Sequence, residues 1–398
     1  MIHIGKEKMI KIGITTHYTG STNYGGCLQA FALQKELHYM GYSAMQIRFR
    51  STDIRINQRI CRTIKSKRVF DVLKTGIKLR INKLIGKVAN AEPQIRTFKE
   101  SFNAFRDSIP HTTITYDNKS ITNCTDFDIY ITGSDQVWNI GVANYFSVFH
   151  WLSFVPKDKK KISYAASISK MDFPKELYPK VRKLLSDYSA ISVREKQDKE
   201  LLDKILGKGK VRWVLDPTLL LSRKEWDEQC TTNPFKDKKY VFVYLLGDNK
   251  MQRQFVTAWA KKNNRIVINI PYLLGQYRSC DRKFGDIRKS DVTPNLWLSL
   301  IRDADCVFTD SFHATVFSSI FHTPFYVFKR NKDNERTCMN SRIYSLTELL
   351  GCENRIIENN ADIDSIPNLE DIDFVQADKN VAIKREESIS FLKNALEG

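Results

Sequence analysis

The sequence of 398 residues has no stretch of 18 consecutive apolar residues, so we expect no segment of it to span a membrane as a helix. Its eight cysteines are scattered and form no CxxC pair, which argues against a zinc site and a disulfide framework and suits a reducing cytosol. The first residues, MIHIGKEKMIKIGI, lack the long apolar core of a secretory signal. We therefore expect a cytoplasmic protein.

Several cofactor and nucleophile motifs are also missing. There is no GxGxxG, P-loop, HExxH, EF-hand loop or GxSxG elbow. His17, His313 and His322 are not spaced as metal ligands on one helix face. The residues therefore indicate no dinucleotide and support no metal site.

The net charge of +18 is unevenly distributed along the chain. Residues 48–106 carry 16 Lys or Arg and 4 Asp or Glu, so we expect this segment to face something acidic. Within it, apolar residues recur every three or four positions over 69–88, which predicts an amphipathic basic helix. This helix could lie on an anionic membrane surface, or it could pack on its own domain with a solvated charged face. Because the charges lie among aliphatic residues rather than exposed aromatics, we expect no nucleic-acid partner.

Strands and helices alternate along both halves of the chain, which predicts an α/β fold of two Rossmann-like, doubly wound domains facing across a cleft. The expected strands are 10–16, 43–47, 127–132, 161–166, 190–193 and 211–215 in the first half, and 240–246, 265–270, 306–308 and 325–328 in the second. We expect an N-terminal domain at 1–232 with a basic helical insertion at 51–106, a C-terminal domain at 239–352, and a tail at 353–398. The final helix of that tail could pack back on the N-terminal domain.

The stretch DCVFTDSFHATVFSSIFHTPFYVF at 305–328 predicts a strand, a tight turn, a helix and a second strand. The turn holds Asp310, Ser311 and His313, at the carboxyl end of a parallel strand where ligands bind. The helix start favours an anionic group, and a histidine there is well placed to move a proton. Alternatively, Asp310 or Ser311 only caps the helix and His313 only packs in the core.

Polar residues also follow four strands of the first half, namely Ser134 with Asp135, Ser167, Arg194 and Asp216. Several polar strand ends suggest the floor of a shared cleft. We interpret Asp216, which precedes Pro217, as a turn former. A helix-start anion site, a histidine and a strand-end arginine suit the transfer of a group from a compact anionic donor. The residues alone thus predict a two-domain α/β transferase or binding protein.

Several motifs, taken together and in order, resemble the polysaccharide pyruvyl transferase family. They are NYGGCLQAFALQ (23–34), GSDQVWN (133–139), YAAS (164–167), ISVRE (191–195), VLDPTLLL (214–221), WLSLIRDADCVFTDSFHATVFSSIF (297–321) and SRIYSLTELLG (341–351). The resemblance covers about residues 10–352.

The resemblance implies a GT-B-like pair of domains and a cytoplasmic enzyme. The enzyme would transfer pyruvate from phosphoenolpyruvate to a sugar of a bacterial cell-surface polysaccharide or its lipid-linked precursor. The product would be a cyclic ketal with release of phosphate, and no cofactor beyond the donor substrate is required. A lipid-linked acceptor would give the basic helix at 69–88 a purpose, as a peripheral anchor on the inner face of the cell membrane. The competing interpretation is a GT-B glycosyltransferase that uses a nucleotide sugar.

Residue by residue, the resemblance also implies a donor site. Arg194 matches the family arginine proposed to hold the donor's anionic groups, and His313 matches the family histidine, a candidate acid. Some relatives have an arginine where this chain has Ser311, and glycine commonly stands where it has Ala314. We expect the donor to be bound by Arg194, Ser311, Phe312, His313 and Lys329, with Lys329 supplying the cation missing at position 311.

The acceptor is expected on the N-terminal domain. Asp135 could draw the proton from the attacking sugar hydroxyl, which would make Asp135 and His313 the two catalytic residues. The residues expected to bind the acceptor are Asn23, Tyr24, Gly25, Ser134 and Gln136.

Overall fold

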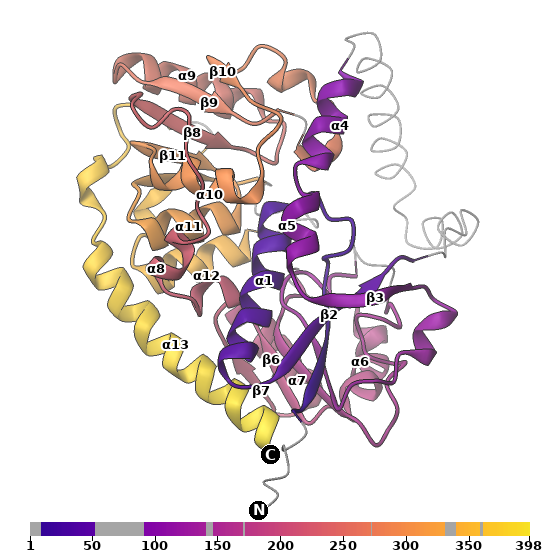
Figure 1. The fold of residues 1–398 in the computed structure, drawn as a ribbon. Helices are drawn as coiled ribbons and strands as arrows, with labels where there is room; N and C mark the ends of the chain where they lie inside the picture. The colour runs from indigo at the N-terminus through magenta and orange to yellow at the C-terminus, as the bar shows by residue number, and fades with distance from the viewer. Residues whose placement is uncertain are drawn as a thin grey trace, which may run out of the picture.

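The computed structural model describes residues 9–51, 91–140, 146–169, 172–271, 273–330, 340–358 and 361–398. Its named strands form two sheets, one of seven strands and one of six, and within each sheet every pair of neighbouring strands is parallel. Figure 1 shows the first domain in indigo to pink, and the second, in orange, beside it. Two parallel sheets covered by helices confirm the predicted doubly wound α/β architecture.

The first sheet has the strand order β3-β2-β1-β4-β5-β6-β7, so the chain starts near its centre and changes direction between β1 and β4. The strands are β1 (Lys11–Thr15), β2 (Ser43–Phe49), β3 (His111–Tyr116), β4 (Ile129–Thr132), β5 (Lys160–Ala166), β6 (Ala190–Val193) and β7 (Val211–Trp213). The helices of this part are α1 (Tyr24–Tyr39), α4 (Glu92–Glu100), α5 (Asn103–Ser108), α6 (Tyr178–Leu185), α7 (Lys196–Leu206) and α8 (Arg223–Asp227). In such sheets ligands bind at the switch point, beyond the carboxyl ends of the strands.

The second sheet has the order β10-β9-β8-β11-β12-β13, with its switch point between β8 and β11. The strands are β8 (Tyr240–Tyr244), β9 (Ile266–Asn269), β10 (Ile287–Arg288), β11 (Cys306–Thr309), β12 (Phe325–Phe328) and β13 (Ile356–Ile357). The helices are α9 (Lys250–Lys262), α10 (Pro294–Arg302), α11 (Phe312–Phe321), α12 (Ser341–Leu350) and α13 (Phe374–Glu397). All residues of β8, β11 and β12 are buried, because central parallel strands are covered on both faces.

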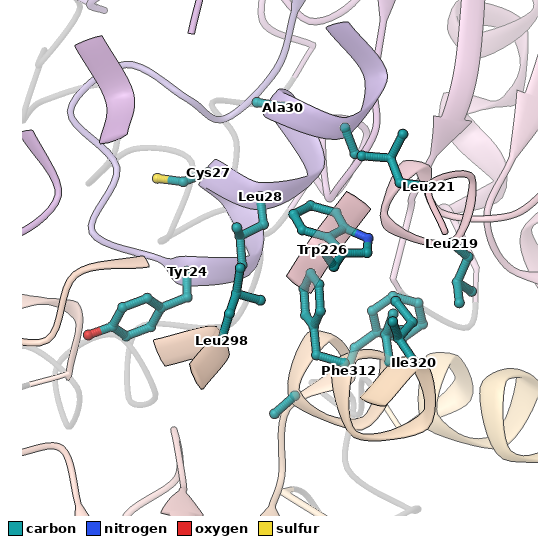
Figure 2. Packing of buried hydrophobic residues seen from close by; sticks show 14 of the residues in the cluster. Tyr24, Cys27, Leu28, Ala30, Leu219, Leu221, Trp226, Leu298, Phe312 and Ile320 are labelled. Carbon is teal, nitrogen blue, oxygen red and sulfur yellow. The ribbon is translucent and has the colours of Figure 1, made fainter. Parts of the chain in front are cut away.

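The two domains share a continuous apolar core. Tyr24 at the start of α1 stacks on Trp297 of α10, with ring centroids 5.2 Å apart and planes at 6°, and its hydroxyl donates to the carbonyl of Val292 at 2.8 Å. Figure 2 shows the same seam from close by, with Leu28 of α1 beside Leu298 of α10. Trp226 of α8 packs edge to face on Phe317 of α11, with ring centroids 4.8 Å apart. Burial of large aromatic side chains on both sides holds the domains in a fixed relation.

Helix α13 connects the two domains along one side of the molecule (Figure 1, yellow). Near its start, Asp378 pairs with His322 of the second domain at 2.9 Å. Further along, the hydroxyl of Ser388 accepts the backbone N–H of Leu215 at 2.9 Å, and the carbonyl of Leu396 accepts Lys160 Nζ at 2.9 Å. The helix therefore ends against the first sheet.

The structure adds elements that the sequence pattern did not predict, and leaves one expected element outside its range. Strands β3, β10 and β13 lie at the sheet edges, where short or half-exposed segments carry no strong apolar pattern. The predicted basic helix at 69–88 lies outside the described residues. Among the helices within those residues, none is both long and apolar enough to cross a membrane.

Candidate active site

Charged side chains from both domains meet where the two switch points face each other. The first domain supplies Asp135, which follows β4, Arg194, which follows β6, and Asp216, three residues after β7. The second domain supplies His313 from the first turn of α11. The sequence places these residues up to 178 positions apart, yet ion pairs and near contacts connect all four. They form the candidate active site.

Arg194 lies at the centre of this group. Its Nη1 donates to Asp216 Oδ2 at 2.8 Å, its Nε donates to Glu195 Oε1 at 2.9 Å, and its Nη2 lies 3.7 Å from Asp135 Oδ1. The side chain is only 1 % exposed, and its guanidinium lies 4.5 Å above the ring of Phe312. Burial alone would lower the pKa of Arg194, but the three surrounding carboxylates raise it, so the guanidinium stays charged.

Asp216 joins the two domains electrostatically. Its Oδ1 accepts hydrogen bonds from the N–H and hydroxyl of Thr218, as a turn former would. Its Oδ2 accepts from Ser134 Oγ at 2.9 Å and from Arg194, and lies 3.6 Å from His313 Nε2. Burial alone would raise the pKa of Asp216, but His313 and Arg194 hold it well below its usual range. The interpretation of Asp216 as only a turn former was therefore incomplete.

Asp135 is presented by an unusual backbone segment. The preceding Gly133 has φ +116°, and a Cβ at that position would lie 2.1 Å from the carbonyl oxygen of Tyr164. Asp135 itself has φ +64° and is almost completely buried. Burial would raise its pKa, but Arg194, followed by His313, lowers it. The positive groups around Asp135 therefore favour its ionised form inside the cluster.

His313 is positioned by contact with the first domain. A Cβ added at Gly25 would lie 2.0 Å from His313 Nδ1, so the glycine leaves space for the imidazole at the start of α1. Ser311 is the N-cap residue of α11, and its side chain makes no capping hydrogen bond. The histidine therefore projects from the amino end of a buried helix, where the helix dipole favours anions.

Two buried nitrogens of this group have no hydrogen-bond partner among the described residues, Arg194 Nη2 and His313 Nε2. Buried polar atoms are usually hydrogen-bonded, and exceptions cluster at functional sites. Both nitrogens lie next to carboxylates of the site, Asp135 and Asp216 respectively. Within the described part of the chain, both are therefore unsatisfied polar atoms buried within the cluster between the two domains.

The other residues predicted for the site fall into two groups. Ser134 joins the cluster through Asp216, and Phe312 through Arg194. By contrast, the structure buries Tyr24 in the core between the domains, so its ring cannot contact an acceptor. Lys329 forms an ion pair with Glu358 and lies 5.6 Å above the ring of Tyr344.

Asn23 and Gln136 lie at the first switch point but already have partners. Asn23 caps α1 by accepting the N–H of Gly26 at 3.4 Å. Gln136 Oε1 accepts from Asn139 Nδ2 at 2.9 Å, and the Gln136 carbonyl contacts His17 Nε2 at 3.1 Å. His17 is one of the groups that lower the pKa of Asp135, and no motif in the sequence singled it out.

Asp310 connects the second switch point to a further arginine. Its carboxylate accepts the backbone N–H groups of Leu246 and Gly247, each at 2.7 Å, and pairs with Arg330 Nε at 3.3 Å. Asp310 therefore fixes the turn before α11 and does not cap the helix. Neither Arg330 nor the buried Arg342 was selected from the sequence, although Arg330 follows a strand end as Arg194 does.

A separate pocket of about 790 Å³ lies between α7, β7 and α13. Two of its basic side chains already have acidic partners, because Lys199 pairs with Asp203 and Lys384 with Glu387, each at 2.6 Å. Among the described residues, no three His, Cys, Asp or Glu side chains are grouped as a metal site would require. The polar cluster between the domains remains the candidate site.

The comparisons with known proteins identify the family. The family model for polysaccharide pyruvyl transferase matches residues 23–332. The chain belongs to this family. A comparison with curated proteins gave no match. The four clustered residues of this pyruvyl transferase family member all fall within the matched range.

Solved structures show where the fold recurs. A putative UDP-N-acetylglucosamine 2-epimerase from Listeria monocytogenes superimposes with a TM-score of 0.51 at 12% identity, covering 98% of this chain and 97% of that chain. UDP-GlcNAc 2-epimerase from Neisseria meningitidis superimposes with a TM-score of 0.48 at 11% identity, covering 95% of this chain and 100% of that chain. MurG from Acinetobacter baumannii superimposes with a TM-score of 0.43 at 8% identity, covering 97% of this chain and 100% of that chain. At 12% identity the first of these likenesses concerns the fold alone. Together with the two parallel-sheet α/β domains, it agrees with the predicted GT-B-like pair.

Proposed function

We propose that the protein transfers pyruvate from phosphoenolpyruvate to a sugar of a bacterial cell-surface polysaccharide or its lipid-linked precursor, forming a cyclic ketal and releasing phosphate. Family membership supports pyruvyl transfer. The observation that carries the proposal is the meeting of Arg194, Asp135 and Asp216 with His313 between the domains. A reaction that joins a donor to an acceptor suits a site built from two domains.

The charges of the site suit the donor. Phosphoenolpyruvate carries a phosphate and a carboxylate, so its site needs fixed cations and N–H donors. Arg194 Nη2 is the guanidinium nitrogen with no hydrogen-bond partner among the described residues, and the amino end of α11 offers backbone N–H groups beside His313. We place the donor between these two features. Arg194 then has two tasks, since its other nitrogens hold Asp216 and Glu195.

His313 acts as the general acid in this mechanism. It donates a proton to the methylene carbon of the donor, which becomes a methyl group, and the adjacent carbon gains cationic character. Asp216, 3.6 Å from His313 Nε2, stabilises the protonated imidazole. A sugar hydroxyl attacks the cationic carbon and passes its proton to Asp135, which is ionised and beside the histidine.

The second half of the reaction closes the ketal. The bond between the former enol carbon and the phosphate oxygen breaks, and phosphate leaves with its electron pair. A second hydroxyl of the same sugar then attacks that carbon and gives up its proton, which the departing phosphate can accept. One proton enters the methyl group and two hydroxyl protons are released, so the step balances without a redox partner or cofactor.

The test is incubation of the protein with phosphoenolpyruvate and a panel of galactosides, mannosides and glucosaminides. We expect phosphate release that depends on both substrates, and a product with the mass of a pyruvate ketal. A parallel arm replaces phosphoenolpyruvate with nucleotide sugars. Release of a nucleoside diphosphate in that arm, without any pyruvylated product in the first, would support the glycosyltransferase alternative and refute the proposal. His313→Ala should abolish most product formation while the protein stays folded.

A further inference from the structure

Three arginine side chains from different elements act on one another electrostatically, and two of them, Arg194 and Arg330, contact residues at the start of α11. They are Arg194 after β6, Arg330 after β12 and Arg342 in the first turn of α12. Arg342 is buried, and burial, together with the positive charges of Arg330 and Arg194, lowers its pKa to about 10. Guanidinium groups brought this close repel one another, so such a group is typical of a site for a multiply charged anion.

Arg330 has the geometry of a ligand-binding residue. Its Nη2 donates to the carbonyl of Asp310 at 2.9 Å, and its Nε lies 3.3 Å from Asp310 Oδ2. Asp310 is itself fixed by the backbone N–H groups at the end of β8. Arg330 Nη1 makes no hydrogen bond to the part of the chain that the structure describes. The side chain is 21 % exposed, whereas that of Arg194 is 1 % exposed, so Arg330 is the more accessible of the two.

The neighbouring Lys329 faces elsewhere. Successive side chains of an extended segment point to opposite sides, and the two residues directly follow β12. Lys329 accordingly reaches Glu358 beyond β13 and lies above the ring of Tyr344 in α12, while Arg330 reaches Asp310 before α11. Arg330 is therefore the cation whose contacts reach the turn before Ser311, whereas those of Lys329 lead to Glu358 and Tyr344.

We propose that Arg330, with Arg342 behind it, forms the second cationic pole of the donor site and binds one anionic group of phosphoenolpyruvate. The other anionic group is then held by Arg194 Nη2 and the amino end of α11. A guanidinium held by Asp310 through one edge presents its remaining nitrogen in a fixed direction, which suits a carboxylate or phosphate oxygen. This inference rests on the proposed function, because it assumes a donor with two anionic groups.

The test measures phosphoenolpyruvate binding by calorimetry in wild type and in Arg330→Gln. The glutamine amide can still donate to Asp310 but carries no charge. Because hydrogen bonds to charged groups are the stronger ones, we expect Kd to rise about tenfold to a hundredfold. The control is Arg265→Gln, which removes an arginine paired with Asp305 at 2.9 Å. Arg265 directly precedes β9 and so lies at the amino ends of the parallel strands, whereas Arg330 follows the carboxyl end of β12. The Kd of Arg265→Gln should equal that of the wild type.

Two further variants decide between the alternatives. The inference would be overturned in favour of Lys329 if Lys329→Ala weakened phosphoenolpyruvate binding while Arg330→Gln bound normally. Should Arg330→Gln fail to fold, Arg330→Lys retains the charge opposite Asp310 but lacks the planar fork, and normal affinity in this variant would refute a directional role. Absence of binding in the wild type would refute the proposed function and this inference together, whereas wild-type binding that Arg330→Gln leaves unchanged would refute this inference alone.

Discussion

The contact between Gly25 and His313 gives the sharpest test of the candidate site. A Cβ at position 25 would lie 2.0 Å from His313 Nδ1, 2.3 Å from Cγ and 2.7 Å from Cε1. Ordinary contacts between such atoms begin at about 3.5 Å, so in Gly25→Ala the imidazole would have to move by roughly 1.5 Å. Because α11 is buried along its whole length, the ring cannot retreat without disturbing its surroundings.

We expect Gly25→Ala to lower kcat about a hundredfold, since a misplacement of ~1 Å in a catalytic group can have that effect. The assay is phosphate release from phosphoenolpyruvate with an acceptor identified in the panel experiment. Gly26→Ala is the matched control, because its new Cβ would meet the carbonyl of His17 and the hydroxyl of Ser21 at 3.3 Å, which a slight shift accommodates. Alanine also favours a helix over glycine by about 1 kcal/mol, so this control should not lose stability.

A double-mutant cycle makes the test independent of any substrate. Truncating His313 to alanine removes the atoms that the new Cβ would strike, so Gly25→Ala should lower Tm in the wild-type background and much less in His313→Ala. In turnover, the double variant should be no worse than His313→Ala alone. Wild-type kcat in Gly25→Ala, or an equal loss of Tm in both backgrounds, would refute the position of His313 against α1.

The remaining predictions concern charge. Arg194→Ala should weaken phosphoenolpyruvate binding measured by calorimetry, and unchanged affinity would remove Arg194 from the donor site. The depressed pKa of Asp216 implies that its ionised form stabilises the fold above the unfolded-state pKa, and that this stability is lost as the pH falls below that value. Tm of the wild type should therefore fall more steeply than Tm of Asp216→Asn between about pH 5 and pH 3. Parallel curves of Tm against pH would contradict this. Burial and Glu195 raise the pKa of Asp198 well above its usual range, so the stability that this group contributes falls as pH rises above the unfolded-state pKa. Asp198→Asn should therefore preserve Tm near neutral pH, and a large loss there would show a required carboxylate. If the segment 69–88 anchors the protein to anionic membranes, its deletion should abolish flotation with anionic liposomes, and flotation that survives the deletion would exclude it as the anchor.

Strands and helices with a clear apolar pattern could be predicted from the sequence alone. The apolar runs that became β8, β11 and β12 and the stretch at 305–328 predicted buried parallel strands with a helix between them. Alternation of strand and helix then left a doubly wound fold as the natural solution, which the structure confirms. Edge strands such as β3 escaped prediction because their half-exposed residues lack a strong period.

Arg194 and Asp135 could be selected from the sequence because each closely follows a predicted strand, and ligands bind beyond the carboxyl ends of parallel strands. This selection depends only on residues close together in the chain. That rule also covered Asp216, but a carboxylate before proline has a sufficient local explanation as a turn former. Only the tertiary structure shows that its second oxygen faces Ser134, Arg194 and His313. Sequence order likewise gave no reason to separate Lys329 from Arg330, whose side chains face different neighbours.

The sequence by itself determined the class of fold, the family and the strand ends on which charged groups stand, because each depends on residues close together in the chain. Only the tertiary structure decided which of those groups share a site. It buried Tyr24 in the core between the domains, set Gly25 against His313, and paired Arg330 with Asp310. These contacts depend on how two separately wound sheets pack against each other, and that packing is fixed by aromatic and aliphatic side chains spread over both domains.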